Sequence, residues 1–129
     1  MAEVLISDDI EAALVPYLRD QLGVPVVTRV PHERPAEFVR ISRLGGNRRI
    51  MIQDQAMVGV WAWADTLERA SILGRHAEGL LFALEGLRLG QSFVYSVVSI
   101  VGPTMTADPD TDSPMCLFNA QITWRLLPA

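Results

Sequence analysis

A segment near the end of the chain, Met115–Leu126, constrains the fold most because every second residue in it is apolar. Side chains of a strand point alternately to the two faces of its sheet, so this strand has one apolar face and one mixed face. Such a strand is typical of an antiparallel or mixed sheet that helices cover on one side. A second strand is expected at Phe93–Val101. The apolar face of the last strand comprises Cys116, Phe118, Ala120, Ile122, Trp124 and Leu126.

Three more strands are predicted in the first half of the chain. Val24–Val30 is rich in β-branched residues, and Phe38–Leu44 follows it after a polar turn. Gly45–Asn47 supplies the positive-φ residues that a tight hairpin turn needs. The returning strand, Ile50–Ala64, exceeds the usual length of about five or six residues, which predicts a bend or bulge near Asp54.

A first helix is expected to begin near Asp8, because Glu11 stands three residues later and completes a capping-box pattern. Gly23 is its expected end. Pro16 lies inside this segment, removes an amide donor and clashes with the carbonyl four residues earlier, which predicts a kink or a later start. The mostly apolar side of the helix comprises Ile10, Leu14, Tyr17, Leu18 and Gln21.

A second, longer helix is expected from the N-cap Asp65, with Glu68 at its third position, to Glu85, before Gly86. Its apolar residues fall within about 100° of arc, the width of a core-facing stripe. Ile72 and Phe82 point away from the stripe, so they are either covered by another part of the chain or offered to a partner. The stripe comprises Ala70, Leu73, Ala77, Leu80, Leu81 and Leu84.

The elements follow the order α-β-β-β-α-β-β, which predicts an α+β fold. We expect a mixed or antiparallel sheet of about five strands, with one long and one short helix packed on it. Residues 1–129 are expected to form a single domain, since a chain of this length buries enough surface to fold without a metal or disulfide.

The composition argues against several classes of protein. The formal charge is −4, whereas general nucleic-acid binding usually requires a basic domain. The N-terminus lacks the basic region and long apolar core of a signal peptide, so we expect no export signal. The longest uncharged stretch, Leu89–Ala107, contains Gly102–Pro103, which would break a spanning helix, and we expect no membrane span.

No motif predicts catalysis, a metal or another cofactor. Cys116 is the only cysteine, and with His32 and His76 alone beside it the chain lacks a zinc ligand set. Cys116 falls on the apolar strand face, where a thiol behaves as a small core residue. Asp108–Asp112 begins like a calcium loop, but Ser113 replaces the required glycine and the later ligand positions do not follow.

The charge is distributed unevenly along the chain. Residues 29–49 contain six arginines against Glu33 and Glu37, a net +4, and the segments on either side are each −4. One reading is a solvated hairpin edge, in which arginines discourage unwanted strand pairing. The other is a basic surface that meets an acidic surface on a neighbouring copy, a contact that can close into a ring. The six basic residues are Arg29, Arg34, Arg40, Arg43, Arg48 and Arg49.

A series of short segments gives the chain a resemblance to one family. The segments are Tyr17–Gly23, Arg34–Arg40, Leu44–Arg49 with the long strand after it, Trp63–Ala64, Gly102–Pro103, the acidic loop, Pro114 and the closing strand Ala120–Arg125. In this order they resemble the tail terminator proteins of long-tailed bacteriophages, over nearly the whole chain.

The resemblance implies a virion protein without catalytic activity, located at the junction of tail and neck and, during assembly, in the host cytoplasm. It implies a hexameric ring whose partners are further copies, the tail tube protein and a head-completion protein. Charge, rather than any family motif, makes the arginines above and Asp108, Asp110 and Asp112 candidates for assembly contacts. Another head–tail neck or stopper protein remains an alternative, as does an enzyme or ligand-binding domain, because a fold alone does not fix a function.

Overall fold

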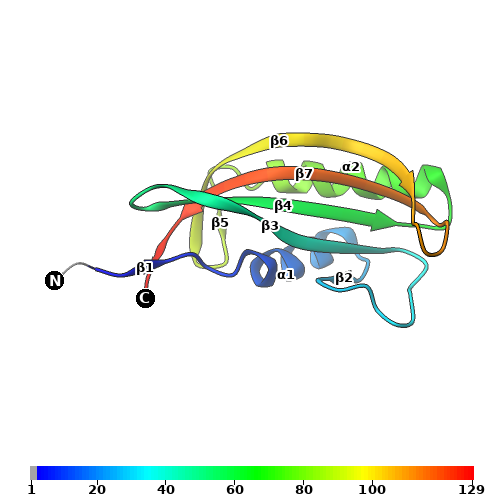
Figure 1. The fold of residues 1–129 in the computed structure, drawn as a ribbon, viewed down its shortest axis with the longest axis horizontal. Helices are drawn as coiled ribbons and strands as arrows, with labels where there is room; N and C mark the ends of the chain where they lie inside the picture. Colours follow the sequence, from blue (N-terminus) through cyan, green and yellow to red (C-terminus); the bar gives the residue numbers. More distant parts are fainter. Residues whose placement is uncertain (1–2) are drawn as a thin grey trace.

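The computed structural model describes residues 3–129, which form a six-stranded sheet with two helices on one face. β2 runs parallel to β3 and all other neighbouring strands are antiparallel. A separate pair, β1 (Leu5–Ile6) and β8 (Leu127–Pro128), joins the two ends of the chain (Figure 1). Across the sheet the order is β2 (Val26–Val27), β3 (Phe38–Ile50), β4 (Gln53–Trp63), β7 (Pro114–Arg125), β6 (Ser92–Ala107) and β5 (Arg88–Leu89).

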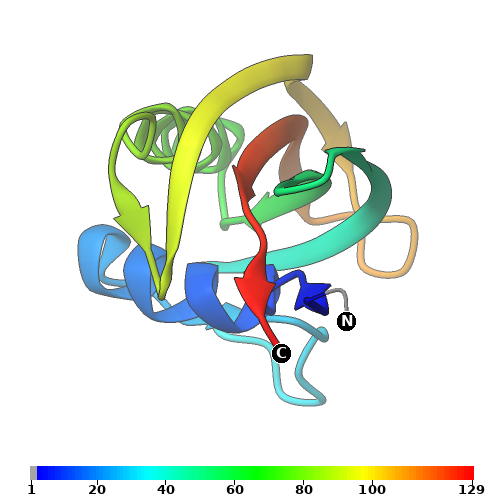
Figure 2. The same cartoon turned by 90° about the vertical axis from the view of Figure 1, so that its left-hand side faces the viewer.

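The sheet curls around the two helices, α1 (Ile10–Leu22) and α2 (Leu67–Phe82), as a view along the strands shows (Figure 2). The predicted α+β class and the order of its main elements are confirmed. The very short strands β1, β5 and β8 have no sequence pattern of their own, because two residues are too few to show a period. Within residues 3–129, neither helix is long and apolar enough to cross a membrane.

The main core lies between the helices and the sheet, as the alternating pattern predicts. Every residue of the predicted apolar strand face is buried, and so is the predicted stripe of the second helix except for the partly exposed Leu80. Leu126 and Leu84 lie just beyond the ends of β7 and α2. The helix approaches the sheet closely at Gly74, where an added Cβ would lie 2.4 Å from the Sγ of Cys116. The single thiol is therefore part of the packing between α2 and β7.

Both helices begin one residue later than predicted. Asp9, rather than Asp8, caps α1 and accepts a bond from the Ala12 amide, and Thr66, rather than Asp65, caps α2. Each pair offers two residues whose side chains can cap a helix, and only the backbone conformation selects one. α1 starts six residues before Pro16 and continues through it, so Pro16 does not delay the start of the helix, and that alternative is wrong.

The predicted turn at Gly45–Asn47 is wrong. β3 continues through these glycines to Ile50, and the chain reverses at residues 51–52. Gly45 and Gly46 have φ angles of 109° and 101°, and a register shift at this point marks a bulge. Positive φ serves bulges as well as turns, and here pairing resumes at Gly46 opposite Ala56. A second register shift, between Arg48 and Ile50, lies opposite Asp54 and Gln53, so the irregularity predicted near Asp54 is present, with the extra residue on β3.

Two other strands differ from prediction in length. The predicted strand Val24–Val30 shortens to β2, because Pro25 lacks an amide donor and the chain leaves the sheet after Val27. β6 extends past Val101 to Ala107 and includes Gly102–Pro103. A proline is tolerated there because β6 is an edge strand over this part, and the register shifts between Val101 and Thr104.

Candidate assembly surface

Arg43 holds the fold together internally rather than presenting a free charge. Its guanidinium forms two bonds to the carboxylate of buried Asp54, at 2.7 and 2.8 Å, and the indole N–H of Trp124 donates to the same carboxylate. Burial raises the pKa of Asp54, but the bonds from Arg43 and Trp124 outweigh it and hold that pKa below its usual value. This arginine thus fixes the base of the β3–β4 hairpin.

Arg34 and Asp108 form a second internal pair, between segments far apart in the sequence. The Arg34 guanidinium donates to Asp108 at 2.6 Å, and the Trp63 indole N–H donates to the same oxygen at 2.7 Å. The Asp110 amide donates to the other oxygen. The bond from Arg34 and that amide are the main reasons why the pKa of Asp108 falls to about 2. Neither Arg34 nor Asp108 is a free charge for a partner.

The Asp108 contacts predict a specific loss of stability in acid. A carboxylate with a lowered pKa stabilises the fold above its unfolded value of 3.8, and this contribution disappears as pH falls toward about 2. We expect the unfolding free energy of the wild type to fall more steeply over this range than that of Asp108→Asn, measured by urea unfolding at several pH values. Equal slopes for the two proteins would contradict the assignment.

A small second cluster lies on the face of the sheet away from the helices. Phe38 and Trp63 stack with ring centroids 4.6 Å apart and pack with Met115. The Arg40 guanidinium lies 4.6 Å from the ring of Trp61 at the edge of this cluster, and its Nε donates to a backbone carbonyl. The Trp63 ring is therefore packed against Phe38, and the Trp61 ring against Arg40, within one chain.

The remaining predicted charges are exposed. Arg29, Arg49, Asp110 and Asp112 form no ion pair within residues 3–129, and the same holds for Arg48, which donates only to the Leu5 carbonyl. Asp112 has a φ of 59°, a conformation that aspartate tolerates better than most residues. These five side chains are the ones that a partner can reach.

Ile72 and Phe82 are each 38% exposed on α2, so the described part of the chain leaves them partly uncovered. A larger uncovered surface is the outer edge of β6, where residues 98–107 are all exposed. They include Val98, Ile100 and Met105. An exposed edge strand carries unpaired backbone groups and invites contact with another chain. Sequence reasoning ended this strand at Val101 and so missed most of the edge.

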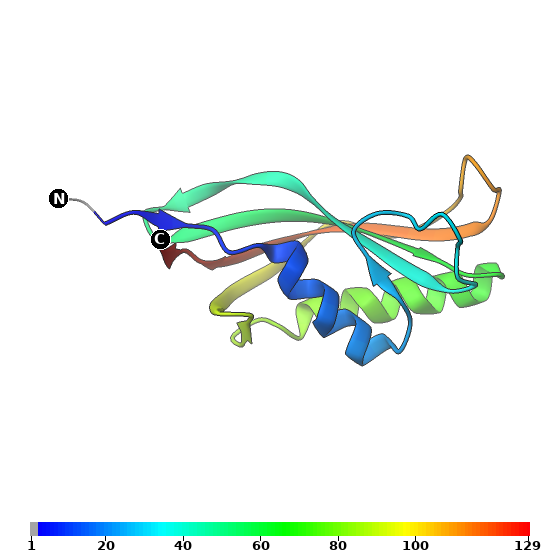
Figure 3. The same cartoon turned by 90° about the horizontal axis from the view of Figure 1, so that it is seen from below.

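The tip of the β3–β4 hairpin is a second feature that sequence reasoning missed. Met51 is 87% exposed and Ile50 is 53% exposed, directly after Arg48 and Arg49. The hairpin projects from one end of the molecule (Figure 3). The run of apolar residues after two arginines is a usable signal, but the predicted strand Ile50–Ala64 places it at the start of the returning strand.

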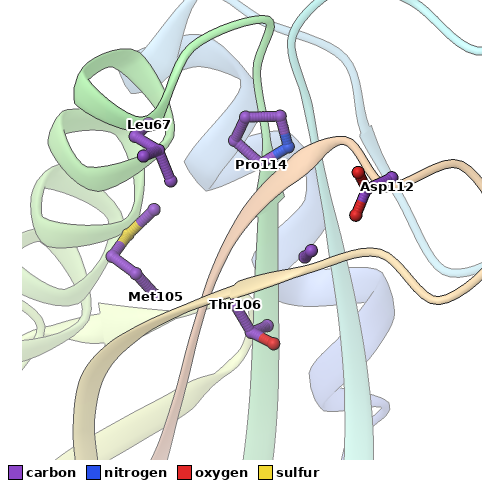
Figure 4. Close-up of a pocket in the computed structure, with 6 residues that line it drawn as sticks. Leu67, Met105, Thr106, Asp112 and Pro114 are labelled. Atoms are coloured by element: carbon purple, nitrogen blue, oxygen red, sulfur yellow. The ribbon is translucent and has the colours of Figure 1, made fainter.

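A pocket of about 340 Å³ lies at the other end of the molecule, between the start of α2 and the end of β6 (Figure 4). Its lining is mostly apolar, and the carboxylate of Asp112 stands on one side. No sequence pattern predicts it, because Leu67 is far in the sequence from the other lining residues, which lie between positions 105 and 114. The lining residues are Leu67, Met105, Thr106, Ala107, Asp112 and Pro114.

The single cysteine lies in the core, away from these surfaces. Cys116 is buried, and burial raises the pKa of its thiol, which fits its predicted place in the core. Residues 3–129 contain no group of three His, Cys, Asp or Glu side chains that could hold a metal ion.

Known proteins resemble this chain at the level of fold. No protein-family model matches it, and no curated protein matches it. Among solved structures, a chain from the virion of a native gene transfer agent (GTA) particle matches with a TM-score of 0.57 and 13% sequence identity. The match covers 90% of this chain and 94% of that chain. At this identity the likeness establishes a shared fold over nearly the whole of both chains.

Proposed function

We propose that this chain is a structural protein of a tailed virion and that it terminates the tail. In this proposal, subunits form a hexameric ring on the last ring of tail tube protein. The ring stops polymerisation of the tube and presents the surface to which the head attaches. The chain catalyses no reaction, and its partners are further copies, the tube protein and a head-completion protein.

The observation that carries the proposal is the fold shared with a GTA virion chain over nearly the full length of both. The resemblance of the sequence to tail terminators adds the position in the virion. The first comes from the backbone fold and the second from the order of segments in the sequence, and both favour a virion role over an enzyme.

The exposed surfaces fit a subunit that is complete only in an assembly. The β6 edge, the hairpin tip and the pocket are all uncovered in one copy. A terminator must not close rings before a tube exists, so its contacts should be weak singly and strong when a tube holds several copies together. Small separate patches suit this requirement better than one large apolar face.

The test is the length of tails made without the protein. If the chain terminates the tail, particles from a strain lacking it should carry overlong tails without heads in negative-stain images. Supplying the wild-type chain should restore one uniform length. Normal-length tails that cannot join heads would contradict termination and favour the alternative, a neck or stopper protein.

A further inference from the structure

Two exposed apolar features lie at opposite ends of the molecule. The hairpin tip, residues 48–51, lies at one end, beside β1 and β8, and the start of α2 and the end of β6 lie at the other (Figures 1 and 3). The pocket is at this second end. The strands between them are extended and paired over most of their length. A chain therefore cannot place its own tip in its own pocket, and any tip that fills the pocket belongs to another copy.

The two features are complementary in apolar character. The pocket volume of about 340 Å³ is far larger than the roughly 30 Å³ that a water molecule occupies in the liquid, so a side chain can enter. Leu67, which lines it, is 63% exposed, and Met105 beside it is also exposed. Met51 is unbranched and flexible, which suits an irregular apolar pocket.

They are also complementary in charge. Arg48 and Arg49 precede the apolar tip, and neither has an ion-pair partner among residues 3–129. Asp112 lines the pocket and Asp110 is close by in the same loop, again without an ion pair in the described chain. Arginine is weakly hydrated and pairs with carboxylates through two bonds, which suits contacts between subunits.

We propose that the hairpin tip of one copy docks into the pocket of a second copy. Met51 contacts Leu67 and Met105 of the second copy, and the two tip arginines face the Asp110–Asp112 loop. This inference rests on the proposed function, because it supplies a contact by which ring subunits recognise each other. A contact between different surfaces of two copies is head-to-tail, and it closes into a ring where the rotation permits.

The decisive variant is Met51→Glu, which places a carboxylate at the tip and opposite the acidic loop. We expect self-association, measured by sedimentation over a range of concentrations, to weaken by about tenfold to hundredfold, the effect of losing one buried methionine. The matched control is Leu87→Glu, which makes the same kind of change, apolar to acidic, at a residue that is 56% exposed and lies outside both features. It should associate as the wild type does.

A mixing experiment tests the pairing of the two features. Leu67→Glu damages the pocket and leaves the tip intact, so this variant and Met51→Glu should each be monomeric. Mixed together, they should form one-to-one dimers, because the tip of the first variant fits the pocket of the second. Circular dichroism of each variant should match that of the wild type.

The docking inference is overturned if the wild type stays monomeric at every concentration, if Met51→Glu associates like the wild type, or if the mixture does not pair. Its failure is separable from failure of the proposed function. Normal tail lengths in particles lacking the chain would refute termination whatever the chain does alone. If the protein is needed for correct tail length but purified Met51→Glu still self-associates like the wild type, only the docking contact is refuted.

Discussion

Replacing Asp54 by alanine should lower the free energy of unfolding by about 3 kcal/mol, the lower end of the cost of breaking a buried ion pair, because the Arg43 side chain is 27% exposed. Asp54 is 2% exposed and accepts bonds from Arg43 and Trp124. Its loss leaves a partly buried guanidinium and a buried indole N–H without their acceptor. Urea unfolding followed by circular dichroism measures the change.

Glu37→Ala is the matched control, since it breaks the exposed pair with Arg69. Exposed pairs contribute little, so this variant should unfold near the wild-type midpoint. Asp54→Asn keeps an acceptor for Trp124 but loses the charge that Arg43 requires, and it should fall between the two. A small effect of Asp54→Ala, similar to that of Glu37→Ala, would contradict the structural role of Arg43 and return it to the set of free surface charges.

Gly46→Ala should disrupt the bulge of β3 much more than Gly45→Ala. Both glycines have positive φ, so a side chain at either costs about 1–3 kcal/mol in backbone strain. At Gly46 an added Cβ would also lie 1.9 Å from the Gln55 carbonyl oxygen, whereas at Gly45 nothing lies within 4 Å. Such overlap costs about 1–3 kcal/mol more.

The hairpin beyond the bulge should respond first. Relief of the overlap requires β3 and β4 to separate locally, so amides of residues 46–56 should exchange with solvent faster in Gly46→Ala than in Gly45→Ala, as measured by hydrogen exchange. Amides in the centre of β7 should be unchanged in both. Equal exchange in the two variants would show that Gly46 does not make the close approach described.

The sequence predicts best where one local pattern decides the structure. Alternation along Met115–Leu126 identifies the core face of β7, because burial on one side of a strand requires a period of two. The stripe of α2 is predicted for the corresponding reason at the helical period. Prediction fails where two local structures require the same residue type. Glycines with positive φ, such as Gly45 and Gly46, suit a hairpin turn and a bulge equally well.

The candidate surface could be predicted only in part, because partners lie far apart in the chain. The cluster of arginines is visible, but the pairing of Arg34 with Asp108 joins residues 74 positions apart. That pair removes two candidates from the exposed set. The pocket likewise arises where the start of α2, the end of β6 and the start of β7 meet, and no one segment signals it.

The central claim, that the chain caps a tail tube, is tested most directly by electron microscopy of tubes grown in its presence. Tubes would be assembled from the tail tube protein of the same virion, with and without the purified chain. The account predicts a ring at one end of each tube and no further growth when more tube protein is added. Tubes that keep growing, or that bind the chain along their sides and not at an end, would contradict it.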